Sequence, residues 1–134
     1  MTLQAAIEDV QATIGAISGI KAAPNYAPEK INEYPFSVAY MGGGLIDFDT
    51  PSATKGLHII VIELHVARKD LPNDISIVAP FIDSIPAALM ADPTLGGTVG
   101  LFENITYEFT PMQWDAVETI GYRFFINGVS QRSC

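Results

Sequence analysis

The chain has 134 residues and a mass of 14.4 kDa, which predicts a single domain over residues 1–134. Hydrophobic residues make up 49% of the chain and charged residues only 16%, a balance that excludes intrinsic disorder. Seven Lys and Arg residues stand against fifteen Asp and Glu residues, and the resulting net charge of −8 disfavours nucleic-acid binding by a basic face.

The first predicted element is an amphipathic helix near the N-terminus. Apolar residues recur at spacings of four and three from Leu3 to Ile17, which places them on one helical face. Thr2 is the predicted N-cap and Gly19 the predicted C-cap. The proline-containing segment 20–35 that follows shows no periodicity, so we expect an irregular connection there.

A short strand over residues 35–40 and a long loop are expected next. The three glycines 42–44 end the strand or permit a close approach of another segment. Residues 45–55 alternate only weakly and include acidic residues and a proline, which indicates a hairpin loop with an acidic tip. Residues 57–67 form the most apolar predicted strand, and their pattern predicts cover on both faces over at least the first half.

A charged turn and a second helical region follow this strand. The turn covers residues 68–73, and the helical region covers about 74–91. Pro80 and Pro86 lie inside the region, so the helix must kink or restart there.

Two long strands complete the chain. They are predicted over residues 101–109 and 120–126, with their Phe and Tyr side chains in the core and residues 111–114 as the turn between them. The element order is therefore helix, two strands, helix, two strands. This order predicts an α+β fold with a mainly antiparallel or mixed sheet and helices packed on one face.

Glu63 and His65 are the most conspicuous candidates for chemistry. Because they are two residues apart in a strand, their side chains lie on the same face, as in a metal-binding pair. His58 has the opposite parity and faces the other side of the sheet, so it cannot complete such a site. We therefore interpret the pair as a salt link at the strand end or a solvent-facing pair, and we expect no metal.

Other candidate motifs are weaker. Asp47 and Asp49 share a face if their segment is extended, but its glycine and proline neighbours favour a solvated tip over acid–base chemistry. Trp114 lies beside Met112 and suits a ligand platform, a hydrophobic plug or a subunit contact. The sequence shows no phosphate loop, nucleophile elbow or Cys-x-x-Cys pair, and Cys134 is the single cysteine. We therefore expect neither enzymatic activity nor a cofactor.

Hydropathy bears on location and assembly. The first residues lack the cationic start and apolar run of a signal peptide, and no stretch approaches the about 20 apolar residues of a membrane helix. A mean hydropathy of +0.26 leaves apolar surface that so small a domain covers best by self-association. The sequence therefore predicts a cytoplasmic oligomer.

Four segments in the second half of the chain resemble one protein family. They are Ile-Asp-Ser-Ile-Pro-Ala-Ala-Leu at 82–89, Asp-Pro-Thr-Leu-Gly-Gly-Thr-Val at 92–99, Ile-Thr-Tyr at 105–107 and Gly-Tyr-Arg-Phe-Phe-Ile at 121–126. Together they resemble the tail terminator, or tail completion, proteins of long-tailed bacteriophages and related phage-like particles. The segment 92–99 is the most specific of the four, and the order of elements agrees over nearly the whole chain.

The resemblance implies a structural protein of the virion. A subunit of this family forms a ring, usually a hexamer, on the head-proximal end of the tail tube, where it stops tube polymerisation and offers a surface to the head connector. It implies a tail-tube protein and a head–tail connector or stopper protein as partners, with DNA passing through the lumen without specific binding. It also implies no enzymatic activity, no cofactor and no membrane.

Candidate contact residues come from the predicted loops and not from a family signature. The first candidate is the loop 42–55, and the second is the turn 68–73. The candidate residues of the loop are Gly43, Gly44, Asp47, Phe48, Asp49 and Lys55, and those of the turn are Arg68, Lys69 and Asp70.

Two alternatives stay open at this point. The chain suits another subunit of the same assembly, namely a connector, stopper or tail-tube protein. It also suits a small α+β enzyme or ligand-binding module that uses Glu63, His65 and a pocket near Trp114. Electron microscopy separates closed rings from long tubes, and metal analysis of a His65→Ala variant tests the second alternative.

Overall fold

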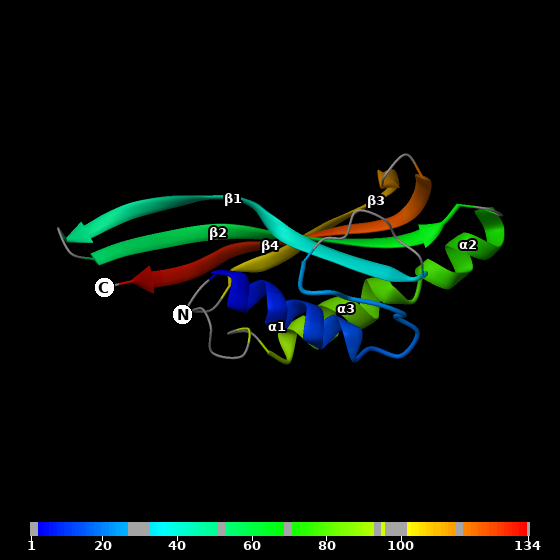
Figure 1. Ribbon diagram of the computed structural model, residues 1–134, viewed down its shortest axis with the longest axis horizontal. Coiled ribbons are helices and arrows are strands. Elements are labelled where there is room, and N and C mark those ends of the chain that lie inside the picture. Colours follow the sequence, from blue (N-terminus) through cyan, green and yellow to red (C-terminus); the bar gives the residue numbers. More distant parts are fainter. Residues whose placement is uncertain are drawn as a thin grey trace.

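The protein has a mixed α+β fold, as the sequence predicts, built on one four-stranded antiparallel sheet (Figure 1). The computed structural model describes residues 3–26, 33–50, 53–68, 71–92, 95, 102–114 and 117–133. The elements are α1 (Leu3–Gly15), β1 (Phe36–Thr50), β2 (Ala53–Ala67), α2 (Leu71–Val78), α3 (Phe81–Met90), β3 (Asn104–Trp114) and β4 (Val117–Ser133). The strand order is β1-β2-β4-β3, so β1 and β3 are the sheet edges.

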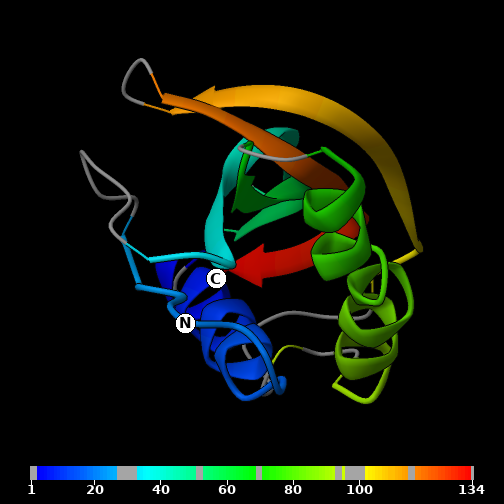
Figure 2. The same cartoon turned by 90° about the vertical axis from the view of Figure 1, so that its right-hand side faces the viewer.

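Helices α1 and α3 pack on the same side of the curved sheet (Figure 2). The predicted apolar face of α1 is confirmed, because Ile7, Val10 and Ile14 are buried in the core that also receives Ile85 of α3. The helix ends earlier than predicted, at Gly15, and Gly19 takes a positive φ of 100° in the turns that follow. The predicted N-cap, at position 2, lies outside the described residues.

The second helical region consists of two helices, one of the two outcomes expected from its prolines. Helix α2 ends at Val78, and α3 starts at Phe81 directly after Pro80. A proline is tolerated there because the first N–H groups of a helix have no intrahelical acceptor. Pro86 lies inside α3, which nevertheless continues to Met90.

The predicted loop 42–55 is wrong, because most of it is strand. Strands β1 and β2 pair along nearly their whole length, with Leu45 opposite Leu57 and Asp47 opposite Lys55. A register shift between Met41 and Gly43 accommodates the glycines as a bulge. The low strand propensity of this segment is thus outweighed by its backbone hydrogen bonding, residue by residue, with the strongly apolar β2. The hairpin projects beyond the helices (Figure 1).

The last two strands are also longer than predicted. Strand β3 continues through residues 111–114, which were expected to form a turn. Pro111 lies on the edge strand β3. Proline has no N–H to donate, and an edge strand tolerates it at a position whose N–H side faces solvent and not the partner strand. In the neighbouring β4, a Cβ on Gly121 would overlap the carbonyl oxygen of Leu64, so the close approach of β4 to β2 requires glycine.

Strand β2 is covered on both faces in its second half, not in its first half as predicted. Every residue from Ile60 to Val66 is buried, whereas Leu57 is 41% exposed and Ile59 is 36% exposed. The even-numbered residues of this half face the core between the sheet and the helices; they are Ile60, Ile62, Leu64 and Val66. We call the opposite face, which carries the odd-numbered residues of β2, the outer face. The first half is uncovered because it belongs to the projecting hairpin (Figure 1).

Two carboxyl groups meet near the end of α3. Asp9 lies on α1, and Asp92 follows α3. Burial, a hydrogen bond to Asp92 and the charge of Asp92 raise the pKa of Asp9 from 3.8 to about 6. Burial is the largest cause of this shift, and the neighbouring Asp92 carboxyl adds to it because two like charges repel each other.

We predict that Asp9→Asn stabilises the protein at pH 7 by roughly 1 kcal/mol, a figure discounted for solvent screening. The folded-state pKa of Asp9 is about 6, whereas the ordinary pKa of an aspartate is 3.8, so the folded state holds the extra proton between these values. Stability from this group is therefore full below about pH 4 and falls as pH rises to about 6. Urea unfolding of wild type and Asp9→Asn across this range measures the effect. If the free energies of unfolding of wild type and Asp9→Asn differ by the same amount at pH 4 and pH 7, the prediction is contradicted. Glu8→Gln, on the same helix, is the charge control.

Candidate functional site

A buried polar cluster lies on the outer face of the sheet. Glu63 is 6% exposed and His65 is fully buried, and His65 Nε2 donates to Glu63 Oε1 at 2.9 Å. The Tyr40 hydroxyl donates to Glu63 Oε2 at 2.5 Å. Thr119 Oγ1 lies 2.6 Å from His65 Nδ1. Strands β1, β2 and β4 each contribute to the cluster, so it ties the three strands together.

Arg123 of β4 completes the cluster toward solvent. Its Nε lies 3.5 Å from Glu63 Oε2, and its Nη1 donates to Glu108 Oε1 at 2.7 Å. Burial by itself would raise the pKa of the Glu63 carboxyl, but the hydrogen bonds from His65 and Tyr40 and the charge of Arg123 lower it below 4.5. Burial and the neighbouring Glu63 carboxylate raise the pKa of Tyr40 to about 12. Glu63 is therefore an anion at neutral pH.

The shared face of Glu63 and His65 was predicted correctly, and so was the opposite orientation of His58. Glu63 and His65 are joined by a hydrogen bond, and both are buried, so the solvent-facing alternative is wrong. The ring of Trp114 packs edge-on against the His65 ring, with centroids 5.7 Å apart. The described residues include no group of three or more His, Cys, Asp or Glu side chains placed to hold a metal ion.

An exposed apolar surface covers the outer face of the projecting hairpin. Leu45 is 57% exposed, and its cross-strand partner Leu57 is 41% exposed. Ile59 is 36% exposed and lies on the same face, opposite Gly43. We call Leu45, Leu57 and Ile59 the hairpin surface. Three neighbouring aliphatic side chains in water are unfavourable, which is typical of a surface that another protein covers.

A second exposed apolar surface lies on the opposite sheet edge. Tyr107 is 58% exposed and Phe109 is 43% exposed, both on β3. Tyr122 on β4 packs edge-on against both rings, at centroid distances of 6.1 Å and 5.2 Å. We call Tyr107, Phe109 and Tyr122 the β3 surface. The prediction that these aromatic side chains lie in the core holds for Phe124, which is fully buried, and is wrong for Tyr107 and Phe109.

The residues predicted to contact partners lie in three places. Gly43 and Gly44 are exposed and belong to β1. Arg68 is exposed between β2 and α2, and residues 69–70, which include Lys69 and Asp70, lie outside the described part of the chain. The other four belong to paired strands and not to a loop: Asp47, Phe48 and Asp49 in β1 and Lys55 in β2.

Comparison of the sequence with protein-family models gave no match, and a search of curated proteins gave none either. Within the described residues, each helix is too short or too polar to cross a lipid bilayer.

Proposed function

We propose that this protein is a structural subunit that assembles head to tail with copies of itself into a ring. The observation that carries this proposal is the pair of different apolar surfaces on opposite edges of one sheet. The hairpin surface lies near the β1 edge on the outer face, and the β3 surface lies at the β3 edge on the face that carries Phe124.

Two unlike surfaces favour a ring over a symmetric dimer. A twofold dimer buries the same patch of each copy, so it would leave the second surface in water. A head-to-tail contact buries the hairpin surface of one copy against the β3 surface of the next, and every copy then has both surfaces covered. Such contacts form closed rings when the rotation between copies closes. Aromatic and aliphatic side chains are also the types enriched in protein interfaces.

The assembly we propose is the tail terminator ring of a long-tailed phage or phage-like particle. The sequence segments that resemble this family support the assignment, and so does the net charge of −8. An acidic lumen repels phosphate, so DNA would pass through it without being held. In this proposal the ring, as a hexamer, ends the tail tube and presents its other face to a connector or stopper protein.

We predict that the purified protein forms closed rings at micromolar concentration. Size-exclusion chromatography with light scattering measures the mass of the particle, and negative-stain imaging shows its shape. Addition of the protein to tail tubes is expected to place one ring at one tube end. A particle that stays monomeric at high concentration and leaves tube ends bare would contradict the proposal.

The same images separate the proposal from its alternatives. A tail-tube protein forms long cylinders, whereas a terminator stays as closed rings. For the ligand-binding alternative, metal analysis of the wild type and of His65→Ala is decisive. Bound metal that is lost in His65→Ala would favour that alternative over a ring subunit.

A further inference from the structure

The part of the sheet that projects beyond the helices starts from a common line across the strands (Figure 1). It consists of residues 43–50 of β1, 53–58 of β2 and 129–133 of β4, which pair with one another. We call these three segments the arm and the rest of the protein the body. Strand β3 does not enter the arm, because its first residue, Asn104, lies opposite Asn127. The sheet therefore narrows from four strands to three where the arm begins.

Two register shifts meet at this line, one on each side of Ile59 in β2. The register between β1 and β2 shifts at Gly42, which has no opposite residue, and Gly43 then lies opposite Ile59. The register between β2 and β4 shifts at residues 127–128, which together lie opposite Ile59. Each shift is a bulge, which interrupts the ladder and bends its strand. The ladder of β2 is thus interrupted on both sides at one residue. We call this level the hinge line.

Glycine is present in both bulges. Gly128 has a positive φ of 70°, a conformation that a residue without a Cβ adopts freely. A Cβ on Gly42 would overlap the side chain of the buried Val61, so glycine allows β1 and β2 to approach each other there. Hinges in proteins are a few residues, often small ones, that absorb changes of φ and ψ. The hinge line is therefore the level at which the sheet changes direction most easily.

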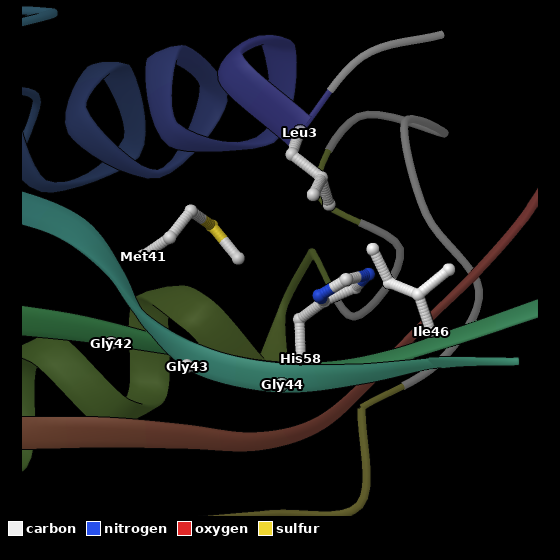
Figure 3. A pocket seen from close by; sticks show the side chains of 7 residues that line it. All are labelled: Leu3, Met41, Gly42, Gly43, Gly44, Ile46 and His58. Atoms are coloured by element: carbon white, nitrogen blue, oxygen red, sulfur yellow. The ribbon is translucent and has the colours of Figure 1, made fainter.

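A pocket of about 290 Å³ separates the arm from the first turn of α1 (Figure 3). Its lining residues are Leu3 of α1, Met41 and the glycines 42–44 around the hinge line, and Ile46 and His58 of the arm. One wall of the pocket thus belongs to the body and another to the arm. A rotation of the arm toward α1 would narrow this space and bring the side chains of Ile46 and Leu3 together.

The burial of apolar side chains favours rotation toward α1 over rotation away from it. Ile46 is 62% exposed, and contact with Leu3 would remove apolar surface from water. Val129 belongs to the arm but is fully buried in the core of the body. Rotation away from α1 would pull this side chain out of the core, which is unfavourable.

We propose that the arm rotates as one three-stranded unit about the hinge line, toward α1, and closes the pocket. Pairing among its strands holds the arm together, whereas the interrupted ladders weaken its connection to the body. The structure has the open position, and in the closed position Ile46 contacts Leu3. A partner that binds the arm better in one position shifts the population toward that position. The inference does not depend on ring formation.

Distances between pairs of spin labels, measured by pulsed electron paramagnetic resonance, test the proposal in the whole protein. With Cys134 replaced by serine, one label is attached at Asp47→Cys in the arm and one at Ala12→Cys, an exposed position of α1. The reference pair, Ala12→Cys with Thr106→Cys on β3, lies within the body. A large excess of unlabelled protein keeps distances between neighbouring copies out of the measurement.

We expect two populations of distances for the arm pair and one for the reference pair. The second population of the arm pair should be several ångströms shorter than the distance in the structure. Asp47 lies about 15 Å beyond the hinge line, at about 3.3 Å per residue, so even a small rotation moves its label measurably. One narrow population for both pairs would overturn the proposal, and so would two populations for the reference pair.

Two tryptophan variants test the direction of the rotation. Ile46→Trp places a large ring in the pocket and should remove the shorter population of the arm pair. Leu45→Trp adds the same ring on the outer face and should leave that population in place. Both side chains are more than half exposed, so the fold should be preserved, as circular dichroism can check. A shorter population that survives in Ile46→Trp, or that is lost in both variants, would overturn the proposal.

Discussion

Replacing Glu63 by alanine is expected to lower the free energy of unfolding by about 3 kcal/mol, because a buried donor that loses its acceptor costs about 1–3 kcal/mol and Glu63 accepts from two donors. The carboxylate accepts hydrogen bonds from His65 and Tyr40 and pairs with Arg123. Without it, the fully buried His65 keeps a donor that water cannot reach. Urea unfolding measures the loss, at several protein concentrations because self-association would change the apparent stability.

Glu108 provides a matched control for this prediction. Its carboxylate accepts a hydrogen bond from the same Arg123 at 2.7 Å, but its side chain is 49% exposed. Solvent screens such a pair, so Glu108→Ala is expected to lower stability by no more than about 1 kcal/mol. Glu63→Gln keeps an acceptor oxygen and should fall between the two. Equal losses for Glu63→Ala and Glu108→Ala would contradict the argument from burial.

The pH dependence of the Glu63 contribution has the opposite sign to that of Asp9. The pKa of Glu63 is below 4.5 in the folded state, so its contribution is complete above about pH 4.5 and is lost as pH falls through the folded-state value. The stability difference between wild type and Glu63→Ala should therefore narrow on acidification. The difference between wild type and Asp9→Asn should also shrink toward pH 4, because Asp9 gains its proton there.

Elements with a strong apolar pattern were predictable from sequence. The stripe of α1 and the apolar run of β2 each bury their side chains in one core, which is why pattern alone located them. The hairpin was not predictable in the same way. Its segment over 42–50 is rich in glycine and aspartate, and it becomes strand through pairing with β2, a long-range contact that local propensity does not contain.

The polar cluster was only half predictable, for a related reason. Glu63 and His65 lie on one strand, so a period of two was enough to place them together. Tyr40, Thr119 and Arg123 come from other strands, and only the register of β1 and β4 against β2 brings them to the pair. The burial of the cluster was missed because Trp114, which packs against His65, was expected to lie in a turn.

Exposure of an apolar face was the feature that pattern analysis could not supply. Alternation on β3 placed Tyr107 and Phe109 on one side of the strand, and a buried interior was the natural expectation for aromatic side chains. Whether another element covers that side depends on where the helices end, and Tyr107 and Phe109 remain uncovered. This exposure is the basis of the assembly argument.

Introducing a single charge into the hairpin surface is expected to abolish ring formation. Leu45→Glu removes a side chain whose full burial contributes about 1.5–3 kcal/mol and places a carboxylate in an apolar contact. We expect association to weaken at least 100-fold, which leaves a monomer at micromolar concentration. Because Leu45 is 57% exposed in the single chain, the fold should be preserved, as circular dichroism can check. Light scattering measures the mass of the particle.

Ile77 of α2 provides the matched control. It is 48% exposed, so it is as accessible as the residues of either surface, but it belongs to neither of them. Ile77→Glu adds the same charge and should leave the ring intact. Loss of the ring in Ile77→Glu as well as in Leu45→Glu would show that added charge alone disrupts assembly, and the assignment of the hairpin surface would then fail.

Mixing two defective variants tests whether the contact is head to tail. Phe109→Glu carries its charge on the β3 surface and should also be monomeric, but its hairpin surface is intact, whereas Leu45→Glu keeps an intact β3 surface. The two variants together should therefore form a one-to-one dimer that cannot grow, because each copy has only one working surface left. If like surfaces paired instead, Phe109→Glu alone would still dimerise through its hairpin, and the mixture would contain no heterodimer.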